Sequence, residues 1–185
     1  MAGGRAFTLG NTDHVDTVVC LDATKGTELW KHAYPSDLGD RFFEGGPTST
    51  PAVEGDRVYV LGRWGDAFCL EAATGNEIWR NKHPVDAKFM PEGAAKPHGK
   101  GPFASPLVAD GNVLTFGIRS TLSCLDAKTG KPAWRQEFDG KFPKPQGEWG
   151  SAASPIVVDG AVIVHAGGGP GPFRDGAGKG ALMAF

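Results

Sequence analysis

The chain has 185 residues, 40% of them hydrophobic, and a formal net charge of -2 at pH 7. This size and composition are typical of a globular domain with a sizeable core and exclude a disordered or fibrous chain. No stretch approaches the roughly 20 apolar residues that cross a bilayer, and the first residues contain no signal-peptide core. Charges of both signs are scattered without a basic run, which disfavours nucleic acid as a partner.

Three predicted strands open the chain, at about 5–9, 17–22 and 27–31, and the last two lie in a segment that recurs twice. The copies are 20–30 (CLDATKGTELW), 69–79 (CLEAATGNEIW) and 124–134 (CLDAKTGKPAW). A period of about 50 residues is too long for an ankyrin or tetratricopeptide unit and is typical of one propeller blade.

A second motif alternates with the first: 49–55 (STPAVEG), 105–111 (SPLVADG) and 154–160 (SPIVVDG). The unit that begins at Ser49 therefore contains four predicted strands, at about 50–53, 57–61, 67–71 and 77–81, separated by turns rich in Gly, Asp and Asn. The next unit repeats them at about 105–109, 112–116, 121–126 and 133–138. The last segment, with strands at about 154–158, 161–164 and 180–185, matches the first three strands of a unit. Each unit is thus a four-stranded antiparallel meander.

The third strand of each unit is apolar on both faces: 18–21 (VVCL), 67–70 (AFCL) and 122–125 (LSCL). Both faces must be buried, which predicts sheets stacked on either side of one another. The sequence therefore predicts an all-β fold, a β-propeller of four-stranded antiparallel blades with about three and a half blades present as a partial ring. We expect a single domain over 1–185, with blades at approximately 1–34, 49–83, 104–138 and 153–185.

Propellers usually close with about 4 to 8 blades, so we expect that the remaining blades are missing from this chain. A ring completed by two copies is the alternative.

Nine repeated residues are expected to be structural. The tryptophans should wedge between neighbouring blades, and the acidic residues and glycines should fix the turns before them. These residues are Trp30, Trp79, Trp134, Gly26, Gly75, Gly130, Asp22, Glu71 and Asp126.

The three cysteines, Cys20, Cys69 and Cys124, occupy one phase of the repeat and are expected to be small buried residues. Equivalent positions on stacked sheets lie about 10 Å apart, whereas a disulfide needs Cα atoms within about 7 Å. The same separation argues against a metal site shared by the three thiols.

Candidate binding residues lie in the long segments 34–48, 83–104 and 139–153, which connect one blade to the next. Such segments gather at the mouth of the central channel, where ligands bind by default. Their polar and aromatic members are Arg41, Glu44, His98, Lys100, Glu148, Trp149 and Ser151. Ordinary solvated loop residues are the alternative interpretation of each. No catalytic, cofactor-binding or metal-binding residue is predicted.

The repeat resembles the quinoprotein-type β-propeller family, whose blades carry the motif Ala-x-Asp-x-x-Thr-Gly-x-x-x-Trp, and the resemblance covers nearly the whole chain. Here cysteines stand where Ala is usual, Glu71 replaces Asp, and Lys25 replaces Thr in the first copy. These departures affect packing and leave the implied fold unchanged.

The family contains dehydrogenases that hold pyrroloquinoline quinone (PQQ) and calcium, and non-catalytic propellers such as the lipoprotein of the bacterial outer-membrane β-barrel assembly machine. The dehydrogenases have an adjacent cysteine pair over the cofactor, and this chain has none. The resemblance therefore implies a non-enzymatic scaffold in the periplasm or cell envelope that binds a protein or a small ligand and needs no cofactor. The alternative is a fragment of a PQQ- and calcium-dependent dehydrogenase of alcohols or sugars.

Overall fold

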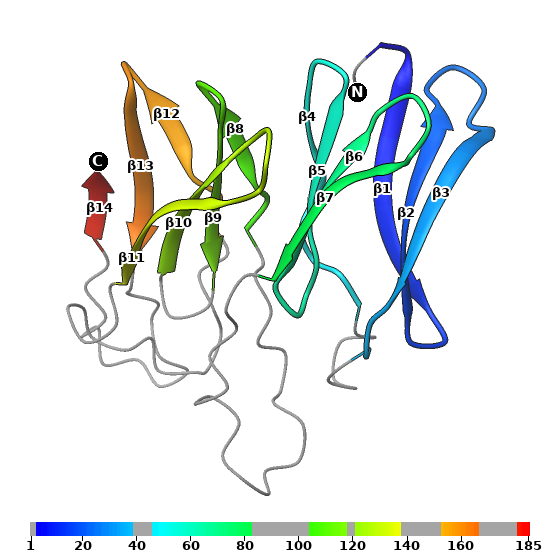
Figure 1. Cartoon of the computed structure of the whole chain (residues 1–185), viewed down its shortest axis with the longest axis horizontal. Helices are drawn as coiled ribbons and strands as arrows, with labels where there is room; N and C mark the ends of the chain where they lie inside the picture. Colours follow the sequence, from blue (N-terminus) through cyan, green and yellow to red (C-terminus); the bar gives the residue numbers. More distant parts are fainter. Residues whose placement is uncertain (1–2, 39–45, 83–103, 118–120, 138–152, 167–180) are drawn as a thin grey trace, which may run out of the picture.

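A computed structural model of the chain describes residues 3–38, 46–82, 104–117, 121–137, 153–166 and 181–185, which form fourteen strands and no helix. The strands make four antiparallel sheets that follow one another along the chain and stand side by side (Figure 1). Each sheet is one blade. The predicted all-β fold of antiparallel meanders in a partial ring is confirmed.

The two middle blades have four strands each, and the two outer blades have three. The first blade comprises β1 (Arg5–Thr12), β2 (Val15–Asp22) and β3 (Glu28–Pro35). The second comprises β4 (Ala52–Glu54), β5 (Arg57–Leu61), β6 (Asp66–Glu71) and β7 (Glu77–Lys82). The third comprises β8 (Leu107–Ala109), β9 (Asn112–Gly117), β10 (Thr121–Asp126) and β11 (Pro132–Glu137). The fourth comprises β12 (Ile156–Val158), β13 (Ala161–Ala166) and β14 (Ala181–Ala184).

A β-bulge recurs after the cysteine of the first three blades. The strand register shifts between Cys20 and Leu21, between Cys69 and Leu70, and between Cys124 and Leu125. A bulge adds one residue to one strand and bends it. The three turns that follow therefore leave their sheets in the same way.

The acidic residue of each turn binds the turn itself. Asp22 accepts hydrogen bonds from the Thr24 hydroxyl at 2.5 Å and from two backbone N–H groups, and Thr129 donates to Asp126 in the same manner at 2.7 Å. These bonds hold the pKa of Asp22 and Asp126 below the ordinary value of 3.8, because they stabilise the carboxylate. The Thr74 hydroxyl donates to Glu71 in the second copy. The glycines that close these turns have φ near +70°, a conformation that suits Gly.

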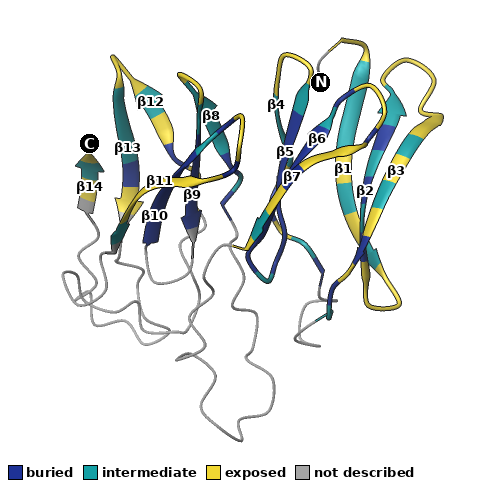
Figure 2. Cartoon of the chain, in the orientation of Figure 1, coloured by how far each residue is buried: buried dark blue, intermediate teal, exposed yellow. Residues whose placement is uncertain are grey.

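Apolar side chains fill all three interfaces between blades. Val18, Val58 and Phe68 belong to the first interface, Tyr59, Cys69 and Leu125 to the second, and Leu114, Leu122 and Val164 to the third. β6 and β10 are buried on both faces because each lies in a blade with neighbours on both sides (Figure 2). β2 alternates instead between buried and more exposed residues, because the first blade has one described neighbour.

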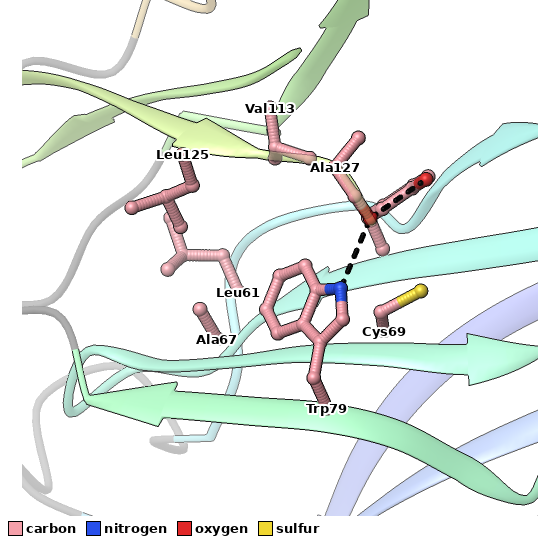
Figure 3. Close-up of a cluster of buried hydrophobic side chains, with 8 residues drawn as sticks. Leu61, Ala67, Cys69, Trp79, Val113, Leu125 and Ala127 are labelled. Carbon is pink, nitrogen blue, oxygen red and sulfur yellow. Dashed lines mark hydrogen bonds between the residues drawn. The ribbon is translucent and has the colours of Figure 1, made fainter. Parts of the chain in front are cut away.

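Two tryptophans fasten a blade to the one that follows. The Trp30 Nε1–H donates to the carbonyl oxygen of Ala72 at 3.0 Å. The Trp79 Nε1–H donates to that of Ala127, also at 3.0 Å (Figure 3). The rings lie on Gly75 and Gly130, where a methyl group would come within 2.6 and 2.4 Å of a ring carbon. Trp134 differs and is 41% exposed, since among the described residues no following turn lies against it.

Candidate functional site

The two ends of the blades differ in what they carry. At one end, at the top of Figure 1, lie the regular turns between β2 and β3 and between β6 and β7; we call it the turn end. At the other end lie the β1–β2 and β5–β6 hairpins and the last residues of β3, β7 and β11; we call it the loop end. The segments that connect successive blades therefore start from the loop end.

All seven candidate binding residues, Arg41, Glu44, His98, Lys100, Glu148, Trp149 and Ser151, lie outside the described residues. The structure does describe where their segments begin and end. The described residues beside those segments at the loop end therefore define the candidate site.

Charged side chains, among them the buried Asp16 and Asp66, gather at the loop end of the first interface. Asp16 of β2 is completely buried and lies between Asn11 of β1 and Tyr34 of β3 in one row across the sheet. The Asn11 amide nitrogen donates to the Asp16 carboxylate at 2.6 Å. Burial and the neighbouring Asp16 carboxylate raise the pKa of Tyr34, whose phenol stays neutral. The second oxygen of Asp16 is buried without a hydrogen-bond partner among the described residues, so the burial of this carboxylate is only partly compensated.

The second blade brings its own buried carboxylate to the same place. The Arg80 guanidinium lies 2.9 Å from one Asp66 oxygen, and the Lys82 ammonium lies 3.6 Å from the other. Arg80 also covers the Phe68 ring, 4.6 Å from the ring centre, which in turn packs on Tyr34. The Tyr34 hydroxyl lies against Gly62, where a methyl group would come within 2.6 Å of it. Polar and aromatic groups from two blades thus form one closely fitted cluster.

The hairpin between β5 and β6 holds both described ends of the first connecting segment. The Trp64 Nε1–H donates to the carbonyl oxygen of Asp37 at 2.7 Å, and the buried Arg63 donates to that of Gly46 at 3.0 Å. The first blade adds a third contact, because Asn11 donates to the carbonyl oxygen of Ser36 at 3.1 Å. The start and the finish of segment 34–48 are therefore fixed on one rigid base.

Hydroxyl groups connect the innermost strands of successive blades. The Thr50 backbone N–H donates to the Ser105 hydroxyl, and the Ser105 backbone N–H donates to the Ser154 hydroxyl, both at 2.9 Å. The three residues each precede a proline that leads into an inner strand. This hydroxyl ladder makes the inner side of the blades polar and fixes where the connecting segments arrive.

The cysteines are buried and free. Burial raises the pKa of all three thiols, that of Cys69 to about 11, so they stay protonated near neutral pH and are poor nucleophiles. Within the described ranges, no three His, Cys, Asp or Glu side chains lie close enough to hold a metal ion.

His32 lies between the first two blades. Its ring meets the edge of Phe68 and lies 3.7 Å from the Glu77 carboxylate of the second blade. The reason is strand alternation, because His32 lies on the same face of β3 as Trp30 and Tyr34.

Stacked antiparallel sheets joined by recurring indole contacts define a β-propeller built from PQQ-like repeats. The family described as outer membrane protein assembly factor BamB matches residues 14–96 and 90–182, which together cover most of the chain. The chain belongs to this family. No curated protein sequence matches it significantly.

Solved structures show the same fold at low sequence identity. BamB from Moraxella catarrhalis is 20% identical, with a TM-score of 0.60 over 99% of this chain and 43% of its own. The quinohemoprotein alcohol dehydrogenase ADHIIG from Pseudomonas putida HK5 is 23% identical, with a TM-score of 0.62 over 90% of this chain and 27% of its own. The computationally designed Ika4 protein is 14% identical, with a TM-score of 0.53 over 96% and 91%. The chain thus spans less than half the length of the two natural proteins.

The sequence reasoning missed the loop-end residues Asp16, Tyr34, Arg63, Trp64, Asp66 and Arg80. Their signal is departure from the repeat. Gly65 stands at the position of Asp16 in the second copy, and Thr17 and Thr121 stand at the position of Asp66 in the first and third copies. A carboxylate that appears in one copy of a repeat and not in the others indicates a local role beyond the packing that all copies share.

Proposed function

We propose that the chain is a non-enzymatic binding scaffold of the bacterial cell envelope, and that its loop end holds a protein partner. The observation that supports this proposal is a pair of hydrogen bonds to the first connecting segment. Trp64 donates to a backbone carbonyl near its start and Arg63 to one near its end. A binding loop gains affinity when its conformation is fixed before the partner arrives. The Asn11–Asp16 hydrogen bond and the Arg80–Asp66 ion pair lie beside the residues that make these anchoring contacts.

The choice of a protein partner and of the envelope rests on family membership. The family is described as an outer membrane protein assembly factor, and the Moraxella catarrhalis protein of this name shares the fold. None of the described elements is a helix that is long and apolar enough to cross a membrane. The proposed location beside a membrane follows from the family description alone.

Site-specific photo-crosslinking in intact bacterial cells tests the proposal. A photoreactive phenylalanine replaces Thr12 or Thr48 at the loop end, or Lys25 or Asn76 at the turn end, all of which are exposed. We expect both loop-end positions to form an adduct with the same envelope protein and both turn-end positions to form none. Equal labelling from both ends, or adducts with cytoplasmic proteins alone, would contradict the proposal.

The alternative is that the chain is part of a PQQ- and calcium-dependent dehydrogenase, and it shares a fold with such enzymes. Addition of PQQ with calcium to the protein separates the two functions. A scaffold shows no saturable change in quinone absorbance and no dye reduction with alcohols or sugars. Tight quinone binding with turnover would show that the chain is part of a dehydrogenase and would contradict the scaffold function.

A further inference from the structure

Three side-chain oxygen atoms at the loop end of the first interface are buried and have no hydrogen-bond partner among the described residues. They are Oδ1 of Asn11, Oδ2 of Asp16 and the hydroxyl oxygen of Tyr34. The three residues form one row across β1, β2 and β3, each opposite the next in the strand register. Buried polar atoms are nearly always paired, so three in one row indicate a binding site.

The contacts within the row place the three oxygens close together. The Asn11 amide nitrogen lies 2.6 Å from Oδ1 of Asp16, so the amide and the carboxylate are neighbours. The Tyr34 hydroxyl is close enough to the Asp16 carboxylate for that charge to raise the pKa of the phenol, although the two groups are not aligned for a hydrogen bond. One carboxylate oxygen thus has an amide oxygen on one side and a phenol oxygen on the other.

The surrounding backbone encloses this group of oxygens. Asp16 is completely buried, and Tyr34 is 3% exposed. Gly62 of the second blade lies so close that a methyl group there would come within 2.6 Å of the Tyr34 hydroxyl. A methyl group on Gly46 would come within 3.2 Å of Asn11 Cβ. A closed site of this kind favours a small ion over the side chain of another protein.

The balance of charge selects a monovalent ion. Arg80 and Lys82 pair with Asp66, and no described Lys, Arg or His side chain makes an ion pair with Asp16. The other two groups, an amide and a phenol, are neutral, so the three oxygens carry one negative charge. One positive charge balances it, whereas a divalent ion would leave an excess charge buried between the blades. Calcium also requires about 6 to 8 oxygen ligands.

We propose that Asn11, Asp16 and Tyr34 bind a monovalent metal cation, sodium or potassium, between the first two blades. Ligand sets made only of oxygen atoms suit hard cations of this kind. Asn11 also donates to the carbonyl oxygen of Ser36, at the start of the first connecting segment, so the ion steadies this segment as well. The ion site does not depend on the protein partner proposed above.

Urea unfolding of the 185-residue chain in three salts tests the proposal. The salts are choline chloride, sodium chloride and potassium chloride, each at about 150 mM so that general screening is equal. We expect sodium or potassium to raise the urea midpoint relative to choline, with a folding equilibrium constant about tenfold higher or more, because an ion that binds only the folded chain stabilises it. The rise should saturate as the metal ion replaces choline stepwise.

Three variants assign the response to the site. Asp16→Asn removes the charge that the ion balances, so its midpoint should be the same in all three salts. Asp66→Asn is the matched control, because that carboxylate is also buried but is paired with Arg80 and Lys82, and it should keep the response. Tyr34→Phe keeps the ring and removes one oxygen, so it should weaken the response, and it replaces Asp16→Asn if that variant does not fold.

Two results would overturn the proposal. If the natural chain has the same urea midpoint in all three salts, the Asp16 carboxylate is satisfied within the protein, by a turn of the Tyr34 hydroxyl towards it. If Asp16→Asn or Tyr34→Phe responds to sodium and potassium as strongly as the natural chain, the ion binds elsewhere. Both results leave the crosslinking at the loop end unaffected.

Discussion

The turn end and the loop end of the same blades follow different rules. At the turn end, one chemistry repeats: an acidic residue fixes a turn, a glycine leaves room, and an indole from the preceding blade lies on it. At the loop end of the first interface, buried side chains that the other copies lack form a single cluster around Asp16 and Asp66. Stability that comes from the repeated end leaves the other end free to specialise.

The largest expected loss of stability comes from a change at the turn end. Trp79→Ala should lower the free energy of unfolding by about 3 to 5 kcal/mol, because a buried indole and its hydrogen bond to Ala127 are lost. Trp134→Ala is the matched control, and its more exposed ring should cost about 1 kcal/mol or less. Urea unfolding followed by circular dichroism measures both. Equal losses would show that the contact of Trp79 with Ala127 and Gly130 contributes nothing.

The next largest loss of stability comes from a change at the loop end. Arg80→Ala should cost about 3 kcal/mol, because it leaves the buried Asp66 carboxylate with only the more distant Lys82 ammonium. Lys31 occupies the matching position of the first blade, where Thr17 replaces the carboxylate, and its exposed ammonium lies 3.8 Å from the exposed Glu28 carboxylate. Lys31→Ala should therefore cost about 0.5 kcal/mol or less in the same urea experiment. A loss at Lys31 as large as that at Arg80 would contradict a special role for the Asp66 cluster.

The third prediction concerns how stability depends on pH through the buried Cys69 thiol, at the interface between the second and third blades. Burial raises the pKa of Cys69 from 9.0 to about 11 in the folded chain, so the unfolded chain loses this proton first as the pH rises. The stability that the thiol contributes is complete below pH 9 and is lost as the pH approaches 11, with a total of about 2 to 3 kcal/mol.

The measurement is a series of urea midpoints from pH 8 to 11 for the natural chain and for Cys69→Ala. The variant should lose less stability over this range than the natural chain. Parallel curves would mean that the thiol does not titrate with unfolding.

The smallest effect sharpens the picture of the repeated turn. Thr129→Val removes the hydroxyl that lowers the pKa of Asp126, so that pKa should rise towards 3.8. Thr24→Val should do the same for Asp22, because the Thr24 hydroxyl donates to that carboxylate from two residues further on. Carbon-13 NMR of the carboxylates during an acid titration measures both shifts. An unchanged Asp126 would assign its low pKa to the backbone N–H groups alone.

The sequence predicts the turn end well because its residues recur in phase. The fold, the antiparallel meanders and the buried cysteines all follow from copies that can be compared with one another. The loop end offers no such comparison, because the other copies of the repeat have no counterpart of Asp16 or Tyr34. The pairing of these two residues across β2 and β3 also depends on strand register. The role of Trp64 was equally hidden, because its hydrogen bond reaches back 27 residues to Asp37. Long-range contacts of single residues carry no periodic signal.

The hydroxyl ladder along the inner strands has a direction. Each rung runs from the backbone of one blade to the side chain of the next, first Thr50 to Ser105 and then Ser105 to Ser154. The third blade thus carries both halves of the joint, a backbone donor for its successor and a hydroxyl acceptor for its predecessor. Duplicating the DNA for this blade would generate a matching joint at both borders without any compensating mutation, so the architecture can lengthen by simple copying.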